Sequence, residues 1–229
     1  MYDAAELKRM VAGRAADLVE EDMLVGIGSG TTAELFLRAL EPRLRSGLRI
    51  RGVASSIRSE RIAAEIGLPL VALTGTLDLA VDGADAIERG TLATIKGLGG
   101  ALTREKLIAD AAQRFVLIAD DSKLFDRLSQ AIDRVPVPVE VLSFGWQLTQ
   151  ERLSAFGTPV LRVGDGTPFV TDNGNFVLDL HVAFLDDPAV FGQTLHSMTG
   201  VVEHGLFVGM ASLALVGSQR GVIELTRER

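Results

Sequence analysis

The sequence of 229 residues contains no cysteine. This absence excludes a disulfide framework, a thiol nucleophile, and any zinc or iron–sulfur site built on thiolate ligands. A chain that does not depend on disulfides is typical of a reducing compartment, so the sequence predicts a cytoplasmic protein. The N-terminal segment supports this prediction, because Asp3 and Glu6 precede Lys8 and Arg9 without the apolar core of a secretory signal.

Long apolar runs and long basic tracts are also missing. The longest apolar run, residues 206–217, contains Ser212 and falls well short of the roughly 20 residues that a membrane-spanning helix needs. The 23 basic side chains are outnumbered by 30 acidic ones, which gives a net charge of −7 at pH 7. An acidic chain without a Lys/Arg tract opposes general binding to nucleic acid or to an anionic membrane, although a few clustered lysines suffice for one phosphate. The sequence therefore predicts neither partner.

Short apolar strands alternate with amphipathic helices along the first half of the chain. Strands are expected at 23–27, 50–54, 70–73, 77–81 and 115–119, and helices at 3–20, 33–40, 57–66 and 103–112. Pro42 is expected to end or bend the second helix. This alternation predicts an α/β fold with a doubly wound, mostly parallel, Rossmann-like sheet and helices on both faces. Ligands of such sheets bind at the carboxyl ends of the strands.

Near residue 130 the pattern changes to α+β elements. A proline-punctuated segment occupies residues 135–141, strands are expected at 159–163 and 176–182, helices at 146–156 and 188–198, and a tight turn at 171–175. From residue 201 an apolar helix and a terminal strand at 221–225 are expected to return to the first sheet. The sequence thus predicts an α/β domain made of residues 1–130 and 204–229, with a smaller α+β domain of residues 131–203.

A segment rich in glycine and hydroxyl groups, Gly26-Ile-Gly-Ser-Gly-Thr-Thr32, lies between the first expected strand and the next helix. Glycines let backbone amides approach an anion, the helix N-terminus adds partial positive charge, and three hydroxyl groups add donors, which suits a phosphate. The segment is not a Walker loop, because no Gly-Lys-Ser/Thr follows, and it lacks the third glycine of the dinucleotide fingerprint. The alternative is a plain turn capped by a serine or threonine. The segment alone leaves both interpretations open.

Three more polar segments follow expected strands. They are residues 82–85 (Asp-Gly-Ala-Asp), residues 96–106 (Lys-Gly-Leu-Gly-Gly-Ala-Leu-Thr-Arg-Glu-Lys) and residues 120–123 (Asp-Asp-Ser-Lys). Each has a structural alternative: an Asx turn for the first, a solvated helix turn for Glu105, and plain surface placement for Lys123. We expect all four segments at the carboxyl ends of strands in one parallel sheet, and therefore at one edge.

Seven blocks in a fixed order give the chain a resemblance to ribose-5-phosphate isomerase type A. They are Gly28–Thr32, Asp82–Asp85, Lys96–Lys106, Asp120–Lys123, Pro138–Val141, Thr171–Asn175 and Gly205–Phe207. Each block is weak alone, but seven in sequence over nearly the whole chain are specific. The resemblance implies interconversion of D-ribose 5-phosphate and D-ribulose 5-phosphate through an enediolate, in the non-oxidative pentose phosphate pathway. It also implies a homodimer, and the proton-transfer chemistry requires neither a metal nor a redox cofactor.

Carried over residue by residue, the resemblance implies a role for each group. Glu105 would accept the proton, Lys96 would stabilise the oxyanion, and Asp82 with Asp85 would orient sugar hydroxyls and assist ring opening. A carboxylate in a water-poor cleft near other carboxylates has a raised pKa, which suits Glu105 as the base. The implied substrate contacts are Lys8, Ser29, Gly30, Thr31, Thr32, Asp82, Gly83, Ala84, Asp85, Lys96, Gly97, Leu98, Gly99 and Lys123.

The sequence departs from the family pattern at four of these and neighbouring positions. Ser29 and Thr31 exchange the family's threonine and serine, which keeps the hydroxyl donors. Leu98 replaces a loop glycine, and Ala86 replaces the glutamate that usually follows the Asp-Gly-Ala-Asp block. Because a side chain penalises positive φ, Leu98 bears on the conformation of the loop.

Other functions share the expected fold class. A non-catalytic sugar-phosphate sensor would keep the phosphate loop and lose the base, so Glu105 opposes it. A CoA-transferase-like enzyme or an amino-sugar-phosphate deaminase is the other alternative. A deaminase is expected to use a histidine near its catalytic carboxylate, whereas His181, His196 and His204 come late in the chain, where we expect surface or packing roles. These scattered histidines also predict no metal site. The unrelated second type of ribose-phosphate isomerase uses a cysteine and is excluded.

Overall fold

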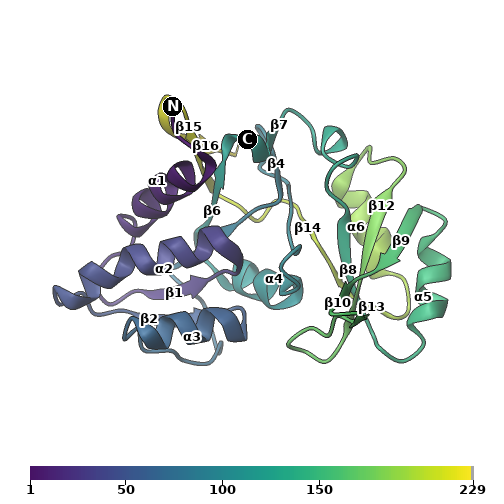
Figure 1. The fold of residues 1–229 in the computed structure, drawn as a ribbon, viewed down its shortest axis with the longest axis horizontal. Coiled ribbons are helices and arrows are strands. Elements are labelled where there is room, and N and C mark those ends of the chain that lie inside the picture. Colours follow the sequence, from purple (N-terminus) through teal and green to yellow (C-terminus); the bar gives the residue numbers. More distant parts are fainter. Residues whose placement is uncertain (228–229) are drawn as a thin grey trace.

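The computed structural model describes residues 1–227, in which a six-stranded sheet and a separate four-stranded sheet lie side by side (Figure 1). The order of the larger sheet is β16-β15-β6-β3-β1-β2. Its first five strands in chain order are parallel to their neighbours, and β16 joins the edge antiparallel to β15. The strands are β1 (Leu24–Ile27), β2 (Arg51–Ala54), β3 (Leu79–Gly83), β6 (Phe115–Asp120), β15 (Leu213–Ser218) and β16 (Gly221–Thr226). The predicted mostly parallel α/β fold is confirmed.

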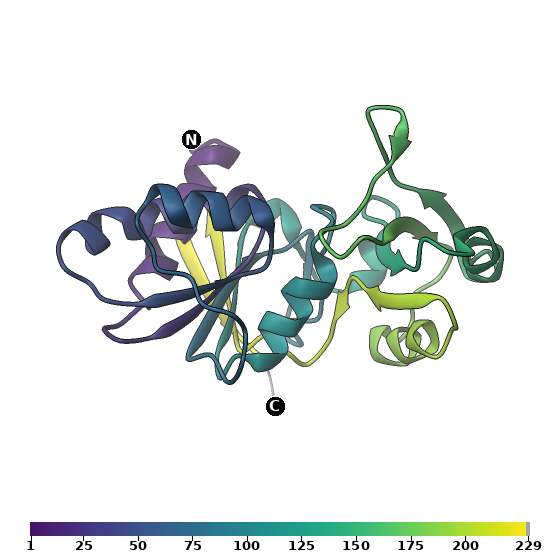
Figure 2. The same ribbon diagram turned by 90° about the horizontal axis from the view of Figure 1, so that it is seen from below.

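Helices cover both faces of this sheet (Figure 2). Helices α1 (Ala4–Ala16), α2 (Gly30–Arg45) and α3 (Ile57–Glu65) pack on one face over a core that includes Phe36 and Leu40. Helix α4 (Leu102–Ala111) packs on the other face, where its Ile108 joins a second core. Burial of apolar surface on both faces is what stabilises a parallel sheet. Among the helices of residues 1–227, none combines the length and hydropathy that a membrane crossing requires.

The smaller sheet is antiparallel, with the order β13-β8-β12-β9. Two helices flank it, and the short hairpin β10–β11 projects from it (Figure 2). These elements are β8 (Val137–Val141), α5 (Trp146–Leu153), β9 (Gly157–Leu161), β10 (Val163–Gly164), β11 (Thr167–Pro168), β12 (Phe176–Val182), α6 (Pro188–His196) and β13 (Val201–His204). The sheet has its own apolar core. The division into domains at residues 131–203 stays a prediction.

A third sheet of four very short strands, which the sequence did not predict, has the order β14-β5-β4-β7. Its strands are β4 (Ala86–Glu88), β5 (Thr94–Ile95), β7 (Leu124–Phe125) and β14 (Leu206–Phe207). Short 3₁₀ helices, η1 (Asp121–Lys123) and η2 (Leu128–Gln130), flank β7. Strands of two or three residues give almost no periodic signal, so only the folded chain reveals them.

Two sequence-based assignments are wrong. The apolar helix expected after residue 201 is instead a series of strands, because residues 213–218 lie between β6 and β16 and are buried on both sides. A fully buried strand and a buried helix have the same continuous apolar pattern. The strand expected at residues 70–73 is reduced to a single bridge between Leu70 and Gly52.

Helix α2 passes through Pro42 and ends at Arg45, so the helix does not end at the proline, which was one of the two expected outcomes. Proline removes one backbone donor, but the last turn still forms, since the Ser46 amide donates to the Pro42 carbonyl at 3.0 Å. The buried face of the helix, with Phe36, Leu37 and Leu40, holds this turn against α1 and the sheet.

Helix α1 approaches β15 so closely that only glycine fits at position 217. A Cβ there would lie 2.7 Å from the Leu7 carbonyl oxygen, a backbone atom. We expect Gly217→Ala to lower the free energy of unfolding by about 1–3 kcal/mol through overpacking. Gly13→Ala is the matched control, because nothing lies within 4 Å of its Cβ position in the same helix. It should raise stability by about 0.5–1 kcal/mol.

Urea unfolding of both variants measures these changes. If both substitutions change the free energy of unfolding in the same direction, this result would contradict the close approach of α1 to β15.

Candidate active site

The predicted polar segments line one cavity of about 150 Å³ at the carboxyl ends of β1, β3 and β6. Asp82 lies directly behind its wall, only 3% exposed, and Leu98 points outward at 42% exposure. All other predicted contacts line the cavity. The lining residues are Lys8, Ser29, Gly30, Thr31, Thr32, Gly83, Ala84, Asp85, Lys96, Gly97, Gly99, Glu105, Ala119, Asp120 and Lys123.

Lys96 reaches the cavity by a route that the sequence did not predict. It follows β5 of the third sheet rather than a strand of the parallel sheet. Its amide donates to the Gly205 carbonyl at 2.8 Å, and the Gly205 amide donates to the Pro138 carbonyl at 2.7 Å. These bonds tie Lys96 to β8 of the small sheet.

The N-terminus of α2 and two lysines form an anion cradle, by which we mean Ser29–Thr32 with Lys8 and Lys123. Ser29 stands at the N-cap, yet its side chain does not cap the helix, and the first turn carries no acidic residue. Its hydroxyl instead pairs with the Ser55 hydroxyl at 2.7 Å. The first amides of a 16-residue helix are thus left to the cavity, where the helix dipole favours an anion.

Opposed charges are buried together in the same cavity wall. Lys96 Nζ lies 2.8 Å from Asp82 Oδ2 and 3.2 Å from Glu105 Oε2, and it donates to the Gly83 carbonyl at 2.6 Å. Asp82 Oδ1 accepts bonds from the Ser29 and Gly83 amides at 3.0 and 2.7 Å. By contrast, Glu105 Oε2 accepts no hydrogen bond of acceptable geometry, although it is buried. Glu105 Oε2 is thus buried against the Lys96 ammonium without a hydrogen bond, in a residue that lines the cavity.

Burial raises the pKa of Glu105 to about 8, and the Asp82 charge adds to this effect while Lys96 opposes it. Burial likewise raises the pKa of Asp82, against the attraction of Lys96. Burial alone would lower the pKa of Lys96, but the Asp82 and Glu105 carboxylates outweigh it and hold that pKa above its ordinary value. The cluster therefore keeps a fixed positive charge beside a carboxyl group that can exchange a proton near neutral pH.

The glycine loop of residues 97–100 adopts its turn without strain at Leu98. Gly97 and Gly100 have φ values of +101° and +84°, whereas Leu98 is not among the residues with positive φ. A Cβ on Gly97 would lie 2.7 Å from Leu102 Cβ. The replacement of a family glycine by Leu98 is therefore compatible with the loop. Ala86 is fully buried in the core of the small sheet.

The residue after Glu105 anchors α4 to the small sheet. Lys106 Nζ donates to Glu203 Oε1 at 2.6 Å and to the His204 carbonyl at 2.7 Å, and it lies 3.2 Å from His204 Nδ1. Its ammonium also lies 4.9 Å from the centroid of the Phe207 ring. On the preceding turn, Thr103 donates to the fully buried Glu140 carboxylate. These contacts fix the rotation of α4 about its own axis, and therefore the direction in which Glu105 points.

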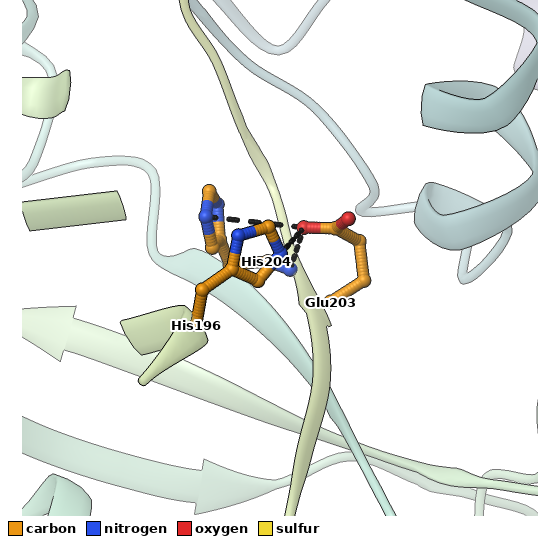
Figure 3. A group of neighbouring side chains, drawn as sticks. All are labelled: His196, Glu203 and His204. Carbon is orange, nitrogen blue, oxygen red and sulfur yellow. Dashed lines mark hydrogen bonds and ion pairs between the residues drawn. The ribbon is translucent and has the colours of Figure 1, made fainter. Parts of the chain in front are cut away.

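His196, Glu203 and His204 form a cluster whose ligand atoms lie within 4.8 Å of one another (Figure 3). Two of the three histidines therefore meet, and their expected scattering is wrong. Burial and the nearby Lys106 ammonium lower the pKa of His204 to about 3, which keeps the ring neutral. Although burial acts the other way, Lys106 holds the pKa of Glu203 below its ordinary value. Because this ammonium already neutralises Glu203, we assign no metal here, and the absence of a metal role stays a prediction.

Sequence reasoning did not single out several residues of the site. Phe207 lies beneath both lysines, with Lys96 Nζ 5.4 Å from its ring centroid, although the sequence showed only a short Gly-Leu-Phe block. Asp120 lines the cavity and accepts from the Ser122 amide at 3.1 Å. The sequence placed its segment, residues 120–123, at this edge of the sheet, but predicted a substrate contact only for Lys123.

Comparisons with known proteins agree with this geometry. Residues 51–221 match the family described as ribose 5-phosphate isomerase A (phosphoriboisomerase A). A ribose-5-phosphate isomerase A of Thermomicrobium roseum is 47% identical over 97% of this chain and 94% of its own length, and one of Gluconobacter oxydans is 46% identical over 94% of each.

Solved structures agree as well. Ribose 5-phosphate isomerase A of Methanocaldococcus jannaschii superposes with a TM-score of 0.91 at 37% identity, over 96% of this chain and 98% of its own. A D-ribose-5-phosphate isomerase in complex with phospho-erythronic acid gives 0.94 at 36% identity, over 99% and 100%.

The raised pKa of Glu105 makes stability depend on pH. The group ionises near pH 8 when folded and near 4.5 at its ordinary value, so the folded chain binds one more proton between these values. Its contribution is full below about pH 4.5 and is lost as the pH rises toward about 8. Glutamine does not ionise, so Glu105→Gln should gain stability relative to the wild type as the pH is raised from about 5 to about 8.

Urea unfolding of both chains across this range measures the difference. Asp110→Asn, an exposed carboxylate on the same helix, is the control and should show no such trend. A Glu105→Gln difference that is constant with pH would contradict the raised pKa.

Proposed function

Because the chain belongs to the ribose 5-phosphate isomerase A family, it is an isomerase of ribose 5-phosphate and ribulose 5-phosphate, and we propose that Glu105 moves the proton between C1 and C2. One observation carries this proposal. Glu105 is 4% exposed, lines the cavity, and has a carboxylate oxygen without a hydrogen-bond donor, 3.2 Å from an ammonium group. A base needs such a free lone pair, and a pKa near neutrality lets it both take and return a proton.

The reaction requires a charge to move from the base to the sugar. Glu105 removes the proton from C2 of the open aldose, the electron pair forms the C1–C2 double bond of the enediolate, and negative charge develops on the oxygen at C1. Glu105 becomes neutral at the same moment, so its attraction for Lys96 falls. The Lys96 charge is then free to stabilise the enediolate oxygen. The hydroxyl proton at C2 then passes to the oxygen at C1, and return of the first proton from Glu105 to C1 gives the ketose, with its carbonyl at C2.

Asp82 and Asp85 have different surroundings, and we assign them different roles. Asp82 is held by two amides and by Lys96, so it positions the ammonium rather than the sugar. Asp85 lines the cavity and is half-buried, with its Oδ2 accepting from the Leu98 amide at 3.1 Å. Its other oxygen is available to a sugar hydroxyl, and we propose that Asp85 assists opening of the furanose ring.

The anion cradle supplies the phosphate site in this proposal. The uncapped amides of α2 and the hydroxyls of Ser29–Thr32 donate to phosphate oxygens, while Lys8 and Lys123 compensate the charge. The remaining predicted contacts, the glycine loop and residues 83–84, then surround the sugar. The sensor and the CoA-transferase-like alternatives receive no support, because the site retains the complete acid–base group and the family is that of an isomerase.

We also propose a homodimer in the cytoplasm, on the grounds of the family resemblance and the absence of cysteine. The reaction belongs to the pentose phosphate pathway, as the family implies.

Replacement of the base tests the assignment directly. We expect Glu105→Gln to lower kcat for conversion of ribose 5-phosphate to ribulose 5-phosphate by about 10²–10⁴-fold, since general base catalysis is worth about that much. The phosphate contacts remain, so KM should change little. Steady-state kinetics of this variant, with Asp110→Asn as the control, measures the effect. A Glu105→Gln enzyme with most of its kcat would show that another group takes the proton.

Isotope exchange distinguishes proton transfer from hydride transfer. A carboxylate base and an enediolate expose the migrating hydrogen to exchange, whereas a hydride shift brings no solvent hydrogen into the product. In deuterated water, we expect deuterium at the carbon that receives the proton, reduced in amount because buried Glu105 returns part of the original hydrogen. NMR or mass spectrometry of the product measures it. A product without any label after many turnovers is the result that would refute the proposed base.

A further inference from the structure

The side chain of Arg162 reaches from the small sheet to the glycine loop of the site. Arg162 follows β9, and its side chain is only 13% exposed. One terminal nitrogen donates to both the Gly97 and the Leu98 carbonyl oxygens at 3.0 Å. No other cationic side chain of residues 1–227 holds these two carbonyls.

The opposite side of the guanidinium is fixed as well. Arg162 Nε donates to Asp179 Oδ2 at 2.9 Å, and its second terminal nitrogen donates to Asp179 Oδ1. This paired geometry orients the guanidinium plane more strictly than a single bond does. Arg162 also lies 5.9 Å from the centroid of the Phe169 ring, and that ring packs so closely on Gly100 that a Cβ there would be 2.4 Å away. The loop is therefore held at two points by residues that flank the β10–β11 hairpin, Arg162 before β10 and Phe169 after β11.

Because Arg162 holds two carbonyl groups of the loop, the orientation of the peptide planes determines where the amide N–H groups of the same planes point. All described peptide bonds are trans, so each amide N–H points away from the carbonyl of its own plane. In the Gly97–Leu98 plane the carbonyl faces Arg162, and the N–H donates to Asp85 Oδ2. In the Leu98–Gly99 plane the carbonyl again faces Arg162, and the Gly99 N–H has no acceptor within residues 1–227, while Gly99 lines the cavity.

We propose that Arg162 is a positioning residue that aims and polarises the Gly99 amide as a donor to the enediolate oxygen. This inference rests on the proposed function. A cation bonded to the carbonyl withdraws electron density from the same amide, so the N–H becomes a stronger donor. The same cation sets the Leu98 amide that holds Asp85. Arg162 itself does not line the cavity and acts through the loop.

Substitution at position 162 tests this role. Arg162→Met keeps the length of the side chain and removes the charge and all its bonds. Removal of one oxyanion donor costs about 10²–10³ in kcat, and a misdirected donor costs part of that, so we expect kcat to fall about 10- to 100-fold. KM for ribose 5-phosphate should stay within about twofold, because the donor acts on charge that develops only in the transition state.

Phospho-erythronic acid provides a second readout. Its carboxylate carries the negative charge that the enediolate develops, and its phosphate uses the anion cradle. We expect Arg162→Met to weaken its binding by a factor similar to the loss in kcat, as measured by calorimetry. Binding of inorganic phosphate to the same variant should be unchanged. A merely structural role for Arg162 would not separate these two ligands.

Two further variants keep the test decisive if Arg162→Met does not fold. Arg162→Lys retains a charge but cannot bridge both carbonyls and both Asp179 oxygens, so kcat should lie between wild type and Arg162→Met. Asp179→Asn frees the guanidinium plane and should shift kcat in the same direction by a smaller factor. Arg152→Gln, an exposed arginine on α5, is the control for loss of one positive charge and should behave as wild type.

The outcomes separate this inference from the proposed function. A folded Arg162→Met enzyme with wild-type kcat overturns the inference alone. So does a variant that loses phosphate and phospho-erythronic acid equally with a raised KM, because the loop would then be only a structural support. A wild-type chain that does not isomerise ribose 5-phosphate would overturn the proposed function, and this inference with it.

Discussion

The buried ammonium of Lys96 is the point on which the rest of the site depends. It lies between the carboxylates of Asp82 and Glu105, and all three side chains are less than 5% exposed. Removing charges from water is costly, so such a cluster persists only when its members compensate one another. Here one cation serves two acids, and the group with the weaker hold, Glu105, keeps a proton near neutral pH. The same arrangement that allows these three charged groups to be buried together gives Glu105 a pKa near neutrality, so that Glu105 can act as a base.

Three separate sheets must meet for this cluster to form. The parallel sheet supplies Asp82, and the third sheet supplies Lys96. Helix α4, which hydrogen bonds to the small sheet hold in place, supplies Glu105. Lys106 and Thr103 turn α4, while Arg162 holds the glycine loop. The small sheet therefore contributes no acid–base group of its own, yet it sets the direction of several groups that do contribute.

The sequence predicted those features that local patterns encode. Strand and helix periodicity identified the parallel sheet and the helices on its faces. The glycine and carboxylate segments were predicted to meet, and the cavity brings them together. What local patterns did not encode was long-range pairing: the third sheet, the strand at 213–218, and the contact of Arg162 with residues some 60 positions away. Such pairings depend on the folded surface rather than on neighbours in the chain, so one sequence does not reveal them.

The position of β15 has a consequence for how the protein is made. This strand lies between β6 and β16 in the parallel sheet, although the whole small sheet separates it from β6 along the chain. Its side chains Leu213 and Leu215 complete the core on one face, and Ala214 and Val216 complete it on the other. During synthesis the first strands therefore leave the ribosome with an open edge at β6 and two unfinished cores. The small sheet, whose last strand β13 ends at His204, is synthesised completely before β15, so the parallel sheet is the later of the two to obtain its full set of strands.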